Sequence, residues 1–186
     1  MKRLLAIIFI FLTLCGCNSK VSEIDDALSI RQQLLKAQGC RFIADISADY
    51  QDGLYHFTLE CETDENGFLK FTVISPEAIS GITGNISSQG GNLTFDDKVL
   101  AFPLLADGLM SPVSGPWILM QALRSGYIKS SGADGDGMVI SINDTYSGET
   151  LTADIYLDHE SHIKHADIFW QGKRILSIAI KDFVYL

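Results

Sequence analysis

The residues between Asp158 and Asp167 are the densest group in the sequence that could bind a metal ion. Histidines stand at positions 159, 162 and 165, and carboxylates stand at 158, 160 and 167. Imidazole and carboxylate ligands suit zinc, and three histidines spaced by three would gather if the segment were helical. The pattern favours instead a hairpin turn over 158–162, followed by a strand in which His165 shares a face with Ile163. We therefore predict no metal site here.

Other motifs with known chemistry are incomplete or absent from the sequence. Residues 134–137 (Asp-Gly-Asp-Gly) resemble part of a calcium loop, but they lack the third acidic ligand and the closing glutamate of an EF-hand. The sequence contains no G-x-S-x-G, H-E-x-x-H, P-loop or dinucleotide-binding motif. It thus predicts no catalytic residues and no cofactor.

The N-terminal residues have the order of a secretion signal. Lys2 and Arg3 precede an apolar run over 4–14, which is shorter than the ~20 residues needed to span a bilayer. Residues 14–17 (Leu-Cys-Gly-Cys) then fit a bacterial lipobox. We predict a signal peptide over 1–16, a lipidated tether over 17–22, and acylation of Cys17 that anchors the chain to the extracytoplasmic side of the cell membrane. The alternative is a buried N-terminal helix with two incidental cysteines.

The charge of the chain limits its partners. It carries 14 basic and 23 acidic residues, a formal net charge of −9. Loss of Lys2 and Arg3 with the signal would make the mature chain more acidic still. This balance argues against nucleic acid as a partner, and it leaves membrane attachment to the lipid alone.

Two cysteines, Cys40 and Cys61, remain in the mature chain. They lie on the apolar faces of two alternating segments, 40–50 and 54–62, that predict a hairpin. A register in which paired residue numbers sum to 101 places Cys61 opposite Cys40. We therefore expect a cross-strand disulfide, which extracytoplasmic compartments allow. Two buried free thiols are the alternative, because directly opposed positions are not ideal for disulfide geometry.

The rest of the chain predicts an α+β domain over 23–186. An amphipathic helix is expected over 22–38, ended by Gly39, and a short inserted helix over 116–125 after a Pro- and Gly-rich segment. Residues 130–137 are expected to form a loop. A long antiparallel sheet must curl, and the two helices are available to cover its concave face. Beyond the hairpin, strands are expected over 68–75, 82–88, 92–95, 99–104, 138–142, 151–157, 163–170 and 174–186.

This order of elements, with closing segments at 157–158, 168–172 and 180–183, resembles the LolA/LolB/LppX lipoprotein-carrier superfamily. The resemblance implies a strongly curved, unclosed sheet, or half-barrel, whose apolar inner face is lidded by helices and holds acyl chains in several members. Carriers of the LolA type are soluble, unlike a chain lipidated at Cys17, whereas LolB-like and LppX-like members are lipidated. Leu104-Leu105 and Leu109-Met110 are candidates for an exposed hydrophobic loop of the LolB kind.

Three functions follow as hypotheses. The first is a membrane-anchored lipoprotein that binds or carries a lipid or other hydrophobic ligand in the half-barrel. The second is a non-enzymatic envelope scaffold or sensor that uses the same sheet for protein interaction. The third is a metal-dependent hydrolase built on His159, His162 and His165, although we predict that the protein is not an enzyme. The candidate lining of a ligand cavity, which could equally be ordinary core, comprises Tyr55, Phe57, Phe71, Trp117 and Trp170.

Overall fold

The computed structural model describes residues 19–50, 53–106, 109–135, 137–146 and 148–186. The predicted signal peptide (1–16) and Cys17 lie outside the described residues. Within the described ranges, no helix is both long enough and apolar enough to cross a membrane.

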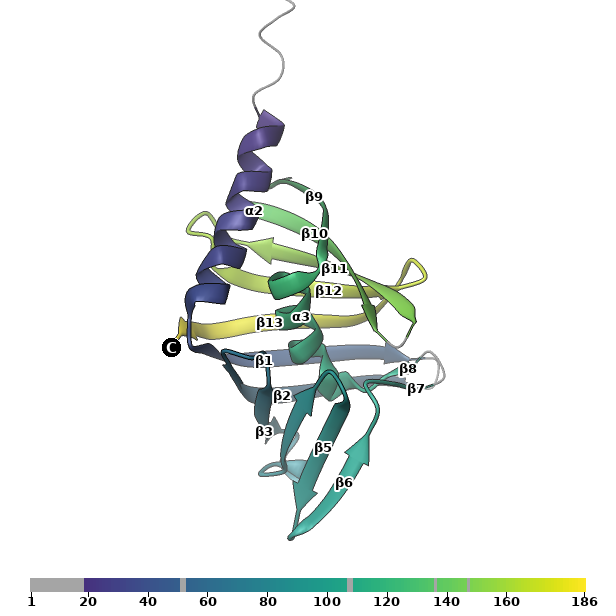
Figure 1. The fold of residues 1–186 in the computed structure, drawn as a ribbon. Coiled ribbons are helices and arrows are strands. Elements are labelled where there is room, and N and C mark those ends of the chain that lie inside the picture. Colours follow the sequence, from purple (N-terminus) through teal and green to yellow (C-terminus); the bar gives the residue numbers. More distant parts are fainter. Residues whose placement is uncertain (1–18, 51–52, 107–108, 136, 147) are drawn as a thin grey trace, which may run out of the picture.

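Eleven strands form one antiparallel sheet in the order β6-β5-β4-β3-β2-β1-β13-β12-β11-β10-β9 (Figure 1). Strands β6 and β9 are its two edges, so the predicted half-barrel is confirmed. A separate pair, β7 (Leu105–Ala106) and β8 (Leu109–Met110), follows β6. The strands of the main sheet are β1 (Gly39–Tyr50), β2 (Gly53–Asp64), β3 (Leu69–Ser75), β4 (Thr83–Ser87), β5 (Gly90–Phe95), β6 (Lys98–Phe102), β9 (Tyr127–Asp134), β10 (Gly137–Tyr146), β11 (Glu149–Leu157), β12 (Ile163–Trp170) and β13 (Lys173–Tyr185).

Two of these strands differ from the prediction in instructive ways. Residues 127–134 form edge strand β9 where a loop was expected over 130–137. Most residues of β9 are exposed or half-buried, and an edge strand tolerates such polar residues because one of its sides faces solvent. In β12, a bulge separates the pairs Tyr156–His165 and Leu157–Ile163, so Ile163 is buried while His165 is half-buried on the other face. The prediction that these two residues share a face is therefore wrong.

Helix α2 (Ser19–Lys36) lies across the strand ends on one side of the sheet (Figure 1). It buries Ala27, Ile30 and Leu34, which are spaced to form one stripe. The predicted helix is confirmed, but it starts earlier, so residues 19–22 of the predicted tether are helical. That segment contains no glycine or proline, and nothing in it stops the helix from extending toward the N-terminus.

Helix α3 (Gly115–Ser125) is the inserted helix, and it lies over the concave face of the sheet (Figure 1). It begins with proline in its first turn, where the missing amide hydrogen costs nothing, and it ends at Gly126. Short 3-10 turns, η1 (Glu77–Ile79) and η2 (Pro112–Ser114), complete the described elements.

Glycines let the β4–β6 part of the sheet pack closely. A Cβ atom on Gly84 would lie 2.4 Å from the ring of Phe71, and one on Gly91 would lie 2.2 Å from the ring of Phe102. Each ring lies over the glycine that pairs with it across the strands. The β5–β6 hairpin is thereby held at the far edge of the sheet.

Candidate functional site

The concave face of the half-barrel is occupied by α3. Eight of the eleven residues of this helix are buried, and Leu119 is fully inaccessible to solvent. A Cβ atom on Gly115 would lie 2.8 Å from Leu176 Cδ1 of β13, so the helix lies in close contact with the sheet. One hydrophobic core therefore joins α3 to both halves of the sheet, from β4 to β10.

Trp117 attaches the N-terminal half of α3 to its surroundings. Its indole Nε1 donates a hydrogen bond to the Gly67 carbonyl at 2.9 Å, in the turn between β2 and β3. Its ring lies edge-on to the ring of Tyr146, with centroids 5.8 Å apart. The Tyr146 hydroxyl in turn donates to Asp144 Oδ2 at 2.9 Å, and burial raises the pKa of Tyr146 well above its usual range.

Arg31 of α2 attaches the C-terminal end of α3. Its guanidinium donates to the carbonyls of Leu123 at 2.7 Å, Gly126 at 2.6 Å and Ala122 at 3.3 Å. The Ala122 carbonyl also accepts a hydrogen bond from the Gly126 amide. Other carbonyls at a helix end lack partners within the helix, and a cation is favourable at this end of the helix dipole. Burial lowers the pKa of Arg31, and the nearby Asp144 carboxylate opposes that effect. Helix α3 is thus held at both ends by side-chain hydrogen bonds.

The structure does not gather the five candidate ligand residues around one cavity. Phe71 and Trp117 are buried in the core, Phe57 and Trp170 are half-buried at its margin, and Tyr55 is 42% exposed. Phe57 and Phe71 are not neighbours in the sheet. Phe71 pairs with Cys61 of β2, and Phe57 lies four residues before Cys61 on that strand, opposite Ile46 of β1. Trp170 lies in the other half of the sheet, opposite Leu151, and donates to Glu149 at 3.0 Å.

Two cavities adjoin α3 at Trp117 and Gln121. One, of about 310 Å³, is also lined by Phe68, and the other, of about 180 Å³, is also lined by Leu104 and Asp144. A further groove of about 380 Å³ lies on the outer face of the sheet and is lined mainly by polar side chains, including the ion pair Arg41–Glu62.

The predicted disulfide between Cys40 and Cys61 is wrong in this structure. Both cysteines are free and buried, and Cys40 pairs with Thr63 while Cys61 pairs with Phe42. Strands β1 and β2 pair up to Tyr50, which lies opposite Gly53, so Gly53 is part of β2 and not of the turn. Each residue of β1 therefore pairs with a β2 residue two positions later than expected. Cys40 Sγ lies 2.9 Å from Thr63 Oγ1 instead.

Burial makes both thiols unreactive in the folded protein. It raises the pKa of Cys40 to about 11 and that of Cys61 still further. In a chain with Cys15 and Cys17 replaced by serine, we expect almost no reaction with a disulfide reagent at pH 8 before denaturation, and two thiols per chain afterwards without reductant. Cys40→Ser should reduce the count to one. A count of zero in the unreduced, denatured chain would contradict the free thiols.

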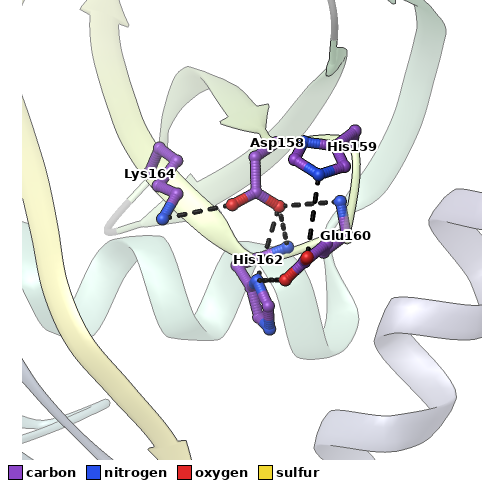
Figure 2. A network of polar contacts seen from close by, with 5 residues as sticks. All are labelled: Asp158, His159, Glu160, His162 and Lys164. Atoms are coloured by element: carbon purple, nitrogen blue, oxygen red, sulfur yellow. Dashed lines mark hydrogen bonds and ion pairs between the residues drawn. The ribbon is translucent and has the colours of Figure 1, made fainter.

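The histidines of the 158–167 cluster do not converge on one point. His159 and His162 lie beside Glu160 at an exposed turn, with nitrogen–oxygen distances of 3.6 and 3.4 Å, as Figure 2 shows. His165 lies in a separate network on β12. Among the described residues, no group of three or more His, Cys, Asp or Glu side chains is arranged to hold a metal ion.

Asp158 organises this turn. Its Oδ1 accepts hydrogen bonds from the backbone amides of His162 at 2.9 Å and Glu160 at 3.0 Å, and its Oδ2 lies 3.1 Å from Lys164 Nζ (Figure 2). These contacts, led by the His162 amide, hold the pKa of Asp158 well below its ordinary value of 3.8. The shape of this turn thus depends on an ionised carboxylate.

Replacing Asp158 with asparagine should lower the melting temperature at pH 7. The folded-state pKa of Asp158 is depressed, so its contribution is complete above the unfolded-state pKa and is lost as the pH falls through the folded-state value. The difference in melting temperature between the wild type and Asp158→Asn should therefore become smaller below about pH 4. Glu77→Gln, at an exposed site, is the control for loss of one negative charge. A difference that does not change with pH would contradict this role.

A Ser-His-Asp group on the outer face, formed by Ser177 of β13 with His165 and Asp167 of β12, is not predicted from the sequence. Ser177 Oγ lies 3.2 Å from His165 Nε2 and donates to Asp167 Oδ1 at 2.8 Å, while Asp167 also accepts from Arg174 at 3.3 Å. A catalytic triad needs serine and aspartate on opposite ring nitrogens, but here both contact Nε2 of His165. The group therefore satisfies the buried Asp167 carboxylate and does not activate the serine.

The β5–β6 hairpin carries exposed apolar residues that the sequence predicted at positions 104–105 or 109–110 instead. Phe95, Val99 and Leu100 are 56%, 67% and 65% exposed, whereas Leu104 and Met110, from the two candidate loops, are buried. The turn between the strands uses Asp96 and Asp97 at φ of 45° and 62°, which suits a tight hairpin. In the sequence, this surface is indicated by two adjacent apolar residues, Val99 and Leu100, shortly after the Asp96-Asp97 turn in a short strand.

No family model matches the chain, and no curated protein matches it. Similar solved structures include a LolA superfamily protein from Nitrosomonas europaea (7% identity, TM-score 0.44, covering 86% of this chain and 93% of that one). Mycobacterium tuberculosis lipoprotein LppX is similar at 9% identity, with a TM-score of 0.41 and coverage of 87% and 93%. A structure of the Clostridioides difficile CwlD amidase in complex with the GerS lipoprotein is similar at 14% identity, with a TM-score of 0.42 and coverage of 93% and 100%. These are similarities of fold alone.

Proposed function

We propose that this protein is a lipid-anchored, non-enzymatic lipoprotein of the cell envelope that works as an interaction scaffold. The observation that carries the proposal is the occupied concave face: α3 fills the position where a half-barrel carrier would hold its ligand. Hydrogen bonds from Trp117 and Arg31 hold that helix in place. The surface, not the interior, is then the part of the molecule available to a partner.

Native mass spectrometry of the purified chain tests the scaffold against a carrier. A scaffold should show the mass of the polypeptide with its covalent anchor alone, and organic extraction should release no stoichiometric lipid. A second, non-covalent lipid per chain would contradict the scaffold and favour the carrier.

The anchor itself is tested at Cys17. Growth with a radioactive fatty acid should label the wild-type chain and a Cys15→Ala variant, and it should leave Cys17→Ala unlabelled. Labelling of Cys17→Ala would contradict lipidation at that residue.

The β5–β6 hairpin is the contact surface that this proposal favours. Strand β6 is an edge of the sheet among the described residues, so its outer backbone groups could pair with an extended segment, and the exposed Val99 and Leu100 of the same strand offer apolar contacts. A photo-crosslinker at Leu100 should give one adduct of defined mass in intact cells, and one at the exposed Lys173 should give none. The same crosslinked adducts from positions 100 and 173 would contradict a contact through β6.

Lipid carriage is the second candidate, and the cavities beside Trp117 and Gln121 favour it. The larger, at about 310 Å³, lies at the lower end of the range of ligand pockets. A whole acyl chain would enter the half-barrel only if α3 moved away from the sheet. How firmly α3 packs on the core therefore distinguishes a scaffold from a lipid carrier.

A further inference from the structure

Helix α2 carries a second apolar stripe that its own fold does not cover. Beside the buried stripe of Ala27, Ile30 and Leu34, the side chains of Ile24 and Leu28 are each 46% exposed. They lie four residues apart, one turn above the other on a single face of the helix. Their side chains form one small contiguous apolar area on the surface of the helix.

This stripe forms one wall of a groove whose other wall is edge strand β9. The groove has a volume of about 440 Å³, and Tyr127, Ile128 and Lys129 line it opposite the helix. Tyr127 is 73% exposed. Aliphatic residues flanked by a tyrosine and a lysine are the combination found where proteins meet the interfacial region of a bilayer.

The predicted anchor lies close to this groove along the chain. Asn18 alone separates Cys17 from Ser19, the first residue of α2. Ile24 follows five residues later, or about 8 Å along the helix axis. That distance is comparable with the ~5–10 Å depth at which interfacial side chains are buried. A lipid on Cys17 would therefore bring the N-terminal half of α2 to the membrane surface.

We propose that the surface formed by Ile24, Leu28, Tyr127 and Lys129 rests on the lipid bilayer and orients the domain on it. This inference rests on the proposed lipidation of Cys17. The exposed carboxylates of Asp25 and Asp26 adjoin the stripe and would be repelled by anionic lipid. The contact is thus apolar in origin, and it should form on zwitterionic lipid and change little with salt.

The orientation also fixes where the other exposed apolar surface points. The N-terminal end of α2 and the β5–β6 hairpin lie at opposite ends of the molecule (Figure 1). With α2 and β9 at the bilayer, the β5–β6 hairpin that carries Val99 and Leu100 lies at the end of the molecule away from it (Figure 1). A partner at the hairpin would then be bound at a distance from the membrane.

Site-specific quenching tests this orientation in the full-length lipoprotein reconstituted into phosphatidylcholine vesicles. Ser130→Cys, at an exposed position lining the groove, and Val99→Cys, on the hairpin, are labelled with bimane. The native Cys40 and Cys61 are fully buried and stay unlabelled. Nitroxide-labelled lipid should quench the probe at position 130 at least threefold more than the probe at position 99.

The double variant Ile24→Ser/Leu28→Ser, made with the probe at position 130, should abolish that difference while the protein still floats with the vesicles. Equal quenching at the two positions, or quenching unchanged by the double variant, would overturn the proposal. A chain that fails to float would overturn the anchor at Cys17 instead, and flotation without selective quenching would overturn the orientation alone.

Discussion

Replacement of Trp117 by alanine is expected to lower the free energy of unfolding by about 3–5 kcal/mol, the cost of removing a large aromatic residue from a core. Trp117 is 3% exposed, packs against Tyr146 and bonds to the Gly67 carbonyl. The cavity left between α3 and the sheet cannot close easily, because Arg31 holds the other end of the helix. Urea denaturation followed by far-ultraviolet circular dichroism measures the loss.

Two control variants separate the contributions at this position. Trp117→Phe keeps a ring but leaves the Gly67 carbonyl without its donor, and should cost about 1–3 kcal/mol. Trp170→Ala, at the half-exposed margin of the core, should cost less than Trp117→Ala. If Trp117→Ala were as stable as wild type, α3 would be a loosely held lid, and lipid carriage would become the better account of the fold.

Replacement of Arg31 by methionine should destabilise the domain by about 2 kcal/mol. The variant keeps most of the side-chain volume but leaves the carbonyls of Leu123 and Gly126 without their charged donor, and hydrogen bonds to charged groups contribute ~1.5–3 kcal/mol. It also removes the link between α2 and α3. Protection of the α3 amides in hydrogen exchange should fall more than protection of the β1–β2 amides.

Arg41→Met is the matched control for Arg31→Met. The Arg41 guanidinium pairs with Glu62 at 2.7 Å on the exposed outer face, where solvent screens an ion pair and it contributes little to stability. Equal losses from the two variants would contradict the role assigned to Arg31.

The sequence predicts most elements because their signals are local. The helical spacing of apolar residues at 24, 27, 28, 34 and 35 indicates α2, and Pro116 and Gly126 mark the ends of α3. The register of a strand pair is harder to predict, because it depends on where the turn begins. Gly53 pairs with Tyr50 instead of lying in the turn, and Cys61 is therefore not opposite Cys40. The bulge in β12 likewise changed the face of His165.

The state of the half-barrel interior could not be predicted for a different reason. The same apolar residues serve as core or as cavity lining, and only the packing of α3 against β13 distinguishes the two. The Ser177–His165–Asp167 group needed the pairing of β12 with β13, which brings residues together that the sequence spaces ten or more apart. The β5–β6 surface could have been found from its apolar pair beside a turn.

The position of β1 between β2 and β13 has a consequence for the order of folding. The centre of the sheet joins strands at the two ends of the domain, with Ala44 opposite both Leu59 and Ile180. Pairings so distant in sequence form slowly, because a long loop must close before they are made. While residues 173–185 have yet to emerge, β1 lacks one neighbour and the two halves of the sheet are joined only through the intervening chain. A lipoprotein exported as an unfolded chain would thus be protected from premature folding by the order of its own strands.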